Sequence, residues 1–162
     1  MYRKTTLVLS IAVGLVLVAL AATGCAGIRA SQARQDYIDQ ATRSHVYDKP
    51  CEQVWPDARQ LLFAEGYSVK DTGEGTTMTV ETEWNYEDEF DDTEATRYLV
   101  QGSAPRSGTC KVEFTRSERD DGDLETERDL EMEWELLQRV DPAEARQIRA
   151  EAEEEADRAR NK

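Results

Sequence analysis

The residues of this sequence that could do chemistry are three cysteines, a single histidine and a dense run of carboxylates. The cysteines are Cys25, Cys51 and Cys110, the histidine is His45, and the carboxylates fall within residues 85–94. Thiols can carry lipid, pair as disulfides or bind metal, imidazole can act as a general base, and clustered carboxylates can bind calcium. The compartment of the protein and the elements that position these groups decide which chemistry applies.

The first 24 residues have the organisation of a secretory signal. Arg3 and Lys4 precede an apolar run from Leu7 to Leu20, and the small residues 21–24 follow. A basic head, a short apolar middle and a small-residue exit are what export requires. We therefore expect residues 1–24 to be a signal peptide. Plain secretion and an uncleaved anchor are the alternatives, although the apolar run is shorter than the roughly 20 residues of a spanning helix.

The end of this tract, Gly24 followed by Cys25, resembles the lipobox of bacterial lipoproteins. The resemblance implies that the signal is cut before Cys25 and that the thiol of Cys25 carries diacylglycerol. Ala26, which stands where such proteins can have an aspartate, implies carriage to the outer membrane, facing the periplasm. The implied partners are the membrane, through the N-terminal lipid, and another protein of the cell envelope.

If Cys25 carries lipid, Cys51 and Cys110 are left as an even pair in a compartment that permits disulfides. A bridge between them would close a loop of about 60 residues and contribute roughly 4 kcal/mol at most. Two separately buried thiols are the alternative. A metal site is not expected, because His45 is not at ligand spacing from either cysteine.

The charge of the chain excludes some partners. The formal net charge is -14, with 34 acidic and 20 basic residues, and removal of residues 1–24 would make it more negative. Nucleic acid is therefore not expected as a partner. The same charge opposes close approach of the body of the domain to anionic lipid headgroups.

The mature chain is predicted to contain a lipid-anchored tether at 25–44, a single domain at 45–140 and a charged C-terminal helix at 141–162. The domain opens with a short strand at 45–47, and a helix follows at 51–65, because its apolar residues recur at helical spacing. Pro50 leads this helix and Gly66 ends it. Pro56 predicts that the helix begins as a loose turn and becomes regular only afterwards.

Beyond the helix the apolar residues alternate, which predicts strands. Met78, Val80, Thr82 and Trp84 are expected on one face, and two polar loops are expected at 85–94 and 117–126. The three tryptophans, Trp55, Trp84 and Trp134, are interpreted as core residues. The predicted strands are 67–70, 76–84, 97–101 and 109–116.

Residues 127–139 carry an apolar pattern that suits either a strand or a helix. We predict a helix, because Glu, Leu, Met, Gln and Arg dominate the segment and β-branched residues are nearly absent. The fold class is thus α+β: an antiparallel sheet of about four to five strands packs against the Pro-led helix and a C-terminal helix.

Several residues between 45 and 84 suggest a family. Val54-Trp55, Gly66-Tyr67 and the Thr-Xaa-Trp at 82–84 resemble the repeated domain of BamC-type outer-membrane assembly lipoproteins. The resemblance implies a helix cradled by an antiparallel sheet, and an accessory binding role in place of catalysis.

The residues themselves offer little for catalysis. His45 has no serine or cysteine partner in a nucleophile motif, and the carboxylates of 85–94 lack the central glycine and terminal glutamate of a calcium loop. We expect no cofactor, no metal and no enzymatic activity. The predicted function is a lipid-anchored, non-catalytic binding module in outer-membrane assembly or maintenance; the alternative is a small membrane-tethered enzyme or calcium-binding protein.

Overall fold

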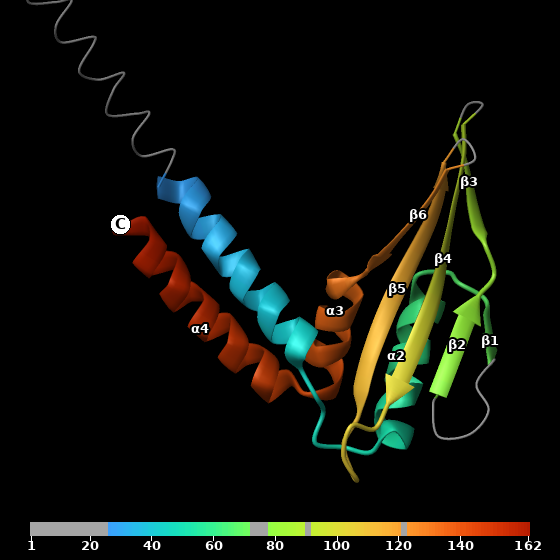
Figure 1. Ribbon diagram of the computed structural model, residues 1–162, viewed down its shortest axis with the longest axis horizontal. Coiled ribbons are helices and arrows are strands. Elements are labelled where there is room, and N and C mark those ends of the chain that lie inside the picture. Colours follow the sequence, from blue (N-terminus) through green and yellow to red (C-terminus); the bar gives the residue numbers. More distant parts are fainter. Residues whose placement is uncertain (1–25, 72–77, 90–91, 121–122) are drawn as a thin grey trace, which may run out of the picture. The chain divides into compact units, whose positions relative to one another are not determined.

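The computed structural model describes residues 26–71, 78–89, 92–120 and 123–162. Within them the chain forms four helices and an antiparallel sheet of six strands, which confirms the predicted α+β class (Figure 1). The helices are residues 26–44, α2 (Cys51–Ala64), α3 (Leu130–Val140) and α4 (Pro142–Arg160). The strands are β1 (Val69–Asp71), β2 (Met78–Thr82), β3 (Asn85–Glu89), β4 (Asp92–Ser103), β5 (Lys111–Asp120) and β6 (Asp123–Arg128).

The chain divides into two compact units, which are described separately. One unit is Asp39–Gln147, and it holds the sheet together with α2 and α3. The other unit combines the chain up to Ile38 with Ile148–Lys162, and its described part is a pair of helices. None of the helices among the described residues is long and apolar enough to cross a membrane.

The sheet of Asp39–Gln147 is an antiparallel meander in the order β1-β2-β4-β5-β6, and β3 also pairs with β4. The long strand β4 has two partners along one side. Its second half pairs with β2, through Val80 and Val100, and its first half pairs with β3, through Tyr86 and Ala95. The predicted strands at 67–70, 76–84, 97–101 and 109–116 are thus confirmed as β1, β2, β4 and β5. At 45–47 only Tyr47 is bridged, to Cys110.

α2 and α3 pack on one face of the sheet, which we call the covered face. The side chains buried between the layers are Val54, Leu61 and Leu62 of α2, Leu136 and Leu137 of α3, and Val80, Val100 and Phe114 of the sheet. At Gly102 a Cβ atom would lie 3.0 Å from the ring of Trp55, so glycine is what permits the close approach of α2 to β4. The opposite face, which we call the open face, carries the alternate residues of the same strands.

The ends of the helices follow the sequence signals. Gly66 has φ 83°, as expected of the glycine that ends α2. α3 confirms the predicted helix from Leu130 onward, whereas Glu127 and Arg128 belong to β6. Asp129 caps α3 by accepting a hydrogen bond from the Met132 N–H at 3.0 Å. The predicted loose turn before Pro56 is wrong, because α2 is helical from Cys51 onward. Pro56 lies on the exposed side of the helix, where water can bind the carbonyl oxygen that proline leaves without a donor.

A disulfide joins Cys51 and Cys110, which confirms the predicted pair. The S–S distance is 2.06 Å and the two Cα atoms are 4.7 Å apart. The bridge connects the first residue of α2 to the residue before β5. Beside it, the backbones of Tyr47 and Cys110 exchange hydrogen bonds of 2.8 and 3.0 Å. The N-terminal end of α2 is therefore fixed to the sheet by one covalent and two hydrogen bonds.

A buried ion pair completes the outer edge of β5, where β6 departs from it. Glu133 of α3 is only 4% exposed and accepts hydrogen bonds from the Phe114 N–H at 3.1 Å and from the Arg128 guanidinium at 2.7 Å. The Asp129 N–H donates to the Phe114 carbonyl at 2.8 Å. Burial raises the pKa of Glu133, and the hydrogen bond to Glu133 raises the pKa of Arg128. The Glu133 carboxylate thus accepts the hydrogen bond of the Phe114 N–H in place of a backbone carbonyl, because the pairing of β5 with β6 begins only at Thr115.

The two predicted polar loops are wrong. The segment 85–94 forms β3 and the start of β4, and the segment 117–126 forms the end of β5 and most of β6, with residues 90–91 and 121–122 outside the described part. The sequence does not indicate these strands, because acidic and other polar residues dominate both, and the side chains of β6 are nearly all exposed. Cross-strand pairing alone places them in the sheet.

Candidate functional site

A one-residue bulge between β2 and β3 turns Trp84 away from the core. Val80 pairs with Val100 in β2, but in β3 Asn85 pairs with Thr96, so the register has moved by one residue. The Thr82 hydroxyl accepts a hydrogen bond from the Tyr98 N–H at 2.8 Å and replaces a ladder bond that the bulge removes. A one-residue shift moves the following side chains to the other face. The prediction that Trp84 shares the core face of Met78, Val80 and Thr82 is therefore wrong.

On the open face, Trp84 is held between two arginines. The guanidinium carbon of Arg97 lies 4.7 Å from the centre of the Trp84 ring, and that of Arg119 also lies 4.7 Å from it. Arg97 donates a hydrogen bond to Glu81 at 2.8 Å. We call these residues, Trp84, Arg97, Arg119 and Glu81, the Trp84 cluster. Stacking on the ring fixes each guanidinium plane and leaves N–H groups at its edge for acceptors.

The surroundings of the Trp84 cluster combine apolar side chains with a positive charge. Tyr86, Ala95, Arg119 and Leu124 form one row across β3, β4, β5 and β6. Tyr86 is 56% exposed and Leu124 is 55% exposed, which is unusual for residues of their type. Arg119 is exposed and forms no ion pair with a described side chain. The row can therefore contact a partner through two apolar side chains and a guanidinium.

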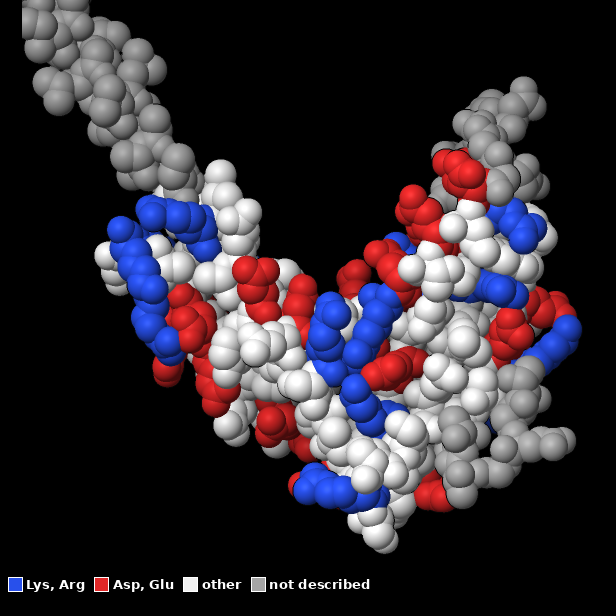
Figure 2. Space-filling view, in the orientation of Figure 1, with Lys and Arg blue, Asp and Glu red and all other residues white. Residues whose placement is uncertain are grey.

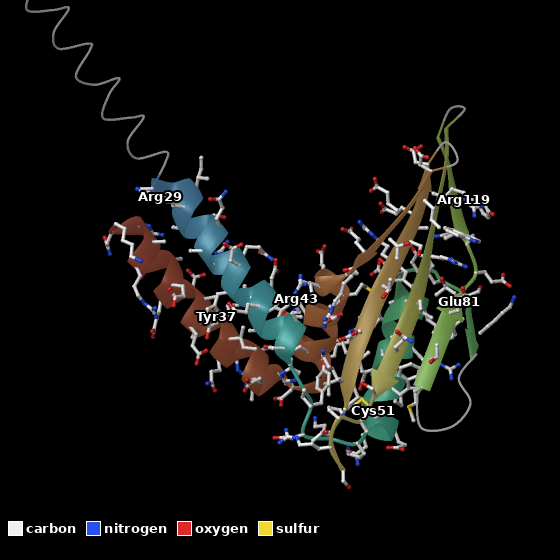
Figure 3. All side chains as sticks on the ribbon, in the orientation of Figure 1. Arg29, Tyr37, Arg43, Cys51, Glu81 and Arg119 are labelled. Atoms are coloured by element: carbon white, nitrogen blue, oxygen red, sulfur yellow. A yellow bond between two sulfur atoms is a disulfide. The ribbon has the colours of Figure 1, made fainter. Side chains whose placement is uncertain are left out.

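Arg97 and Arg119 of the cluster lie in a part of the sheet that we call the arm: β3, β6 and the adjoining residues 92–97 and 116–120. Trp84 directly precedes β3, and Glu81 belongs to β2. Figure 1 shows these strands extending past the ends of α2 and α3, and Figure 3 labels Arg119 near their far end, with Glu81 closer to the helices. Because α2 and α3 do not cover the arm, most of its described side chains are exposed or half-exposed and can reach a partner.

The other face of the arm, on the side of the sheet where α2 and α3 pack, differs in charge from the face that carries the Trp84 cluster. A groove of about 350 Å³ lies there, lined by Arg116, Glu118, Glu125, Thr126 and Glu127. Arg116 pairs with Glu127 at 2.7 Å and with Glu118 at 3.2 Å. Its charge is thus offset by two carboxylates, and the groove is acidic. An anionic ligand would favour the Trp84 cluster over this groove.

A second apolar surface lies on α2, away from the sheet. Trp55, Pro56, Arg59, Gln60 and Phe63 line a shallow groove of about 420 Å³. Phe63 is 53% exposed, close to the values of Tyr86 and Leu124. The α2 groove therefore provides a surface of matched exposure against which binding at the Trp84 cluster can be compared.

The residues singled out in the sequence are not brought together into one site. Cys25 lies outside the described residues, and Cys51 and Cys110 are joined in the disulfide. His45 packs edge-on against Tyr47, with ring centres 4.5 Å apart, and its Nε2 atom is buried without a hydrogen-bond partner. Burial lowers the pKa of His45, although Glu144, Asp141 and Asp48 oppose the shift. His45 is thus a neutral packing residue at pH 7.

The structure does not describe a metal site in the acidic segment 85–94. Its backbone belongs to β3 and β4, and the side chains of residues 87–94 lie outside the described part, so the calcium alternative stays untested there. Among the side chains that the structure does describe, no three of His, Cys, Asp or Glu come together as metal ligands. The enzymatic alternative likewise stays a prediction.

Sequence reading missed the Trp84 cluster for two reasons. Trp84 continues the alternation of β2 and so suggests a core position, while the bulge that overturns it depends on the partner strand. Arg97 was available as a signal, because it is a basic residue in a predicted strand, whereas Arg119 falls in the segment 117–126 that was predicted to be a loop. Their shared face becomes visible only once β4 and β5 are paired, with Arg97 opposite Ser117 and Ala95 opposite Arg119.

The comparisons with known proteins add no family to this site. No family model matches the chain, and no curated protein matches it either.

Proposed function

We propose that the protein is a lipid-anchored, non-catalytic binding module of a bacterial cell envelope, attached to the outer membrane and facing the periplasm. The observation that carries the proposal is the disulfide between Cys51 and Cys110. Disulfides persist in oxidising compartments such as the periplasm. The bridge also leaves Cys25 outside the pair, directly after the signal-like run, where lipidation would use its thiol.

The surface that we propose for binding is the Trp84 cluster with its neighbours Tyr86 and Leu124. Arginine and aromatic residues are the types most enriched at protein interfaces. The partner would be an envelope protein that presents carboxylates to Arg97 and Arg119 and apolar side chains to the row beside them. A role in outer-membrane assembly or maintenance follows from the place of the anchor and from the resemblance to BamC-type lipoproteins.

The anchor is tested by substitution of the thiol that would carry it. In cells given radiolabelled palmitate, the chain should take up label and sediment with membranes, and Cys25→Ser should abolish both. A Cys51→Ser/Cys110→Ser variant serves as the control and should keep the label, because it leaves the Cys25 thiol unchanged. A Cys25→Ser protein that still sediments with membranes would support the uncleaved anchor instead.

The binding surface is tested with a photo-crosslinking amino acid placed at Tyr86, Leu124 or Phe63, three positions of equal exposure. Cross-links to one envelope protein are expected from Tyr86 and Leu124, and these should disappear when Arg97→Gln and Arg119→Gln are added. Phe63 on α2 is the matched control and should give none. Cross-links from Phe63 alone would move the binding surface to the α2 groove.

A further inference from the structure

The second compact unit has one end that differs in chemistry from the rest of the protein. Residues 26–38 and Ile148–Lys162 form a pair of antiparallel helices. Arg34 pairs with Glu153 at 3.1 Å, and the Tyr37 hydroxyl donates to Glu151. Since residue numbers rise along one helix as they fall along the other, the first turn of residues 26–44 lies beside the last turn of α4 (Figure 1).

Small side chains allow these two helices to pack closely. Ala30 is buried on one helix, and Ile148, Ala152 and Ala156 are buried on the other. The three residues of α4 recur every four positions and therefore form one stripe along the helix. The pair is thus held along its length, and the positions of the residues at its end are set by packing.

Basic side chains gather at the end that carries the C-terminus. Arg29 comes from the first helix, and Arg158, Arg160 and Lys162 come from α4 or directly follow it. Figure 2 shows Lys and Arg side chains at this end, with acidic side chains further along the pair, and Figure 3 labels Arg29 there. Most of the 34 acidic residues of the chain lie in Asp39–Gln147. Residues 26–29 and 157–162 together hold these four basic residues and one acidic residue, Asp157, so their charge is opposite in sign to that of the protein.

The ion pairs of Arg158 and Arg160 are exposed to water, and Arg29 also takes part in an interaction. Arg160 pairs with Asp157 at 3.0 Å, and Arg158 pairs with Glu154 at 3.7 Å and with Glu155. All these side chains are exposed or half-exposed, and ion pairs in water are weak and screened by salt. A closely spaced row of phosphate groups can therefore compete for the guanidinium groups.

An exposed apolar residue accompanies the basic side chains. Ile28 is 61% exposed, one position before Arg29 in the first described turn of the helix. An isoleucine in water is unfavourable, whereas at the boundary between headgroups and acyl chains its side chain is buried. Basic residues flanking an apolar one are what surfaces that rest on a bilayer carry.

We propose that this end, consisting of Ile28, Arg29, Arg158, Arg160 and Lys162, rests on the membrane and binds the phosphate groups of anionic lipid headgroups. The inference rests on the proposed anchor, because Cys25 directly precedes the first described residue, Ala26, and would place its acyl chains at this end. One acylated residue and a basic, partly apolar surface together hold the helix pair against the bilayer, while the acidic unit Asp39–Gln147 is repelled by the same lipids.

The test uses the processed chain, residues 25–162, with Cys25→Ser, so that lipid attachment does not contribute. Co-sedimentation measures its partition onto vesicles of phosphatidylcholine alone and onto vesicles of phosphatidylglycerol and phosphatidylcholine in equal parts. We expect binding to the anionic vesicles that falls as salt is raised. Arg158→Gln/Arg160→Gln should lower this partition by about tenfold, and Ile28→Ser should lower it at every salt concentration.

The matched control is Arg146→Gln/Arg149→Gln, which also removes two positive charges from α4, but far from the C-terminal end of that helix. It should bind as the parent does. Equal partition of the parent onto the two kinds of vesicle, or an equal loss in both double variants, would overturn the inference. Absence of palmitate on Cys25 in cells would instead contradict the proposed anchor, whatever the vesicles show, so the two failures are distinguishable.

Discussion

The part of the sheet that α2 and α3 cover, which we call the base, and the arm are stabilised by different interactions. In the base, Val80, Val100 and Phe114 are buried against the two helices, and the disulfide closes one end. Among the described side chains of the arm only those of Ala95 and Ser117 are buried, and strand pairing, the bulge and the contacts of Trp84 hold the strands. Stability therefore depends on the base, and the arm is free to present residues to a partner.

The largest effect is expected from loss of the disulfide in the base. The double variant Cys51→Ser/Cys110→Ser should lower the free energy of unfolding by about 4 kcal/mol, because the bridge closes a long loop in the unfolded chain. Urea denaturation, followed by circular dichroism, measures the loss. The parent protein under reducing conditions should behave as the double variant does, and an unchanged midpoint in both would show that the base does not need the bridge.

The next effect concerns the buried carboxylate at the edge of the base. Glu133→Ala should cost about 3 kcal/mol, because it leaves the buried Phe114 N–H without a partner and leaves the Arg128 guanidinium with only Glu113 and the Arg43 carbonyl oxygen. Glu135→Ala, on the same helix, removes only the half-exposed pair with Arg139 and should cost less than about 1 kcal/mol. Equal losses in the two variants would mean that burial of the Glu133 pair has no role in stability.

The smallest effect is expected in the arm. Trp84→Ala should lower the free energy of unfolding by about 1 kcal/mol, as expected for the loss of exposed cation–π contacts. Hydrogen exchange should become faster in β3, while β2 keeps its protection. Trp55→Ala is the matched control in the base, where the ring packs on Gly102, and it should destabilise the whole unit. A global loss from Trp84→Ala comparable to that from Trp55→Ala would remove the distinction between base and arm.

The elements of the base were predictable because their signals are local. Pro50 and Gly66 mark the ends of α2, Asp129 caps α3, and alternation identifies β2 and β5. The strands of the arm were not predictable in this way. In β6 every side chain except the last is exposed, so no buried face marks it as a strand and its polar residues suggest a loop.

The candidate site was predictable only in part. The cysteine pair followed from counting and compartment, and the structure confirms the bridge. The Trp84 cluster was missed, because its tryptophan continues an apolar alternation and its arginines are distant in sequence. Three residues from β4, β5 and the β2–β3 connection become neighbours only when the strands are in register.

The sequence by itself determined the main helix boundaries and the α+β class, because spacing and capping residues act within a few positions of the chain. Only the tertiary structure decided on which face Trp84 lies, how far the sheet extends beyond its helices and which helix pairs with residues 26–38. These features depend on register and on the packing of distant segments. A shift of one residue at a bulge moves the following side chains to the opposite face of the sheet, and the local sequence pattern does not indicate this shift.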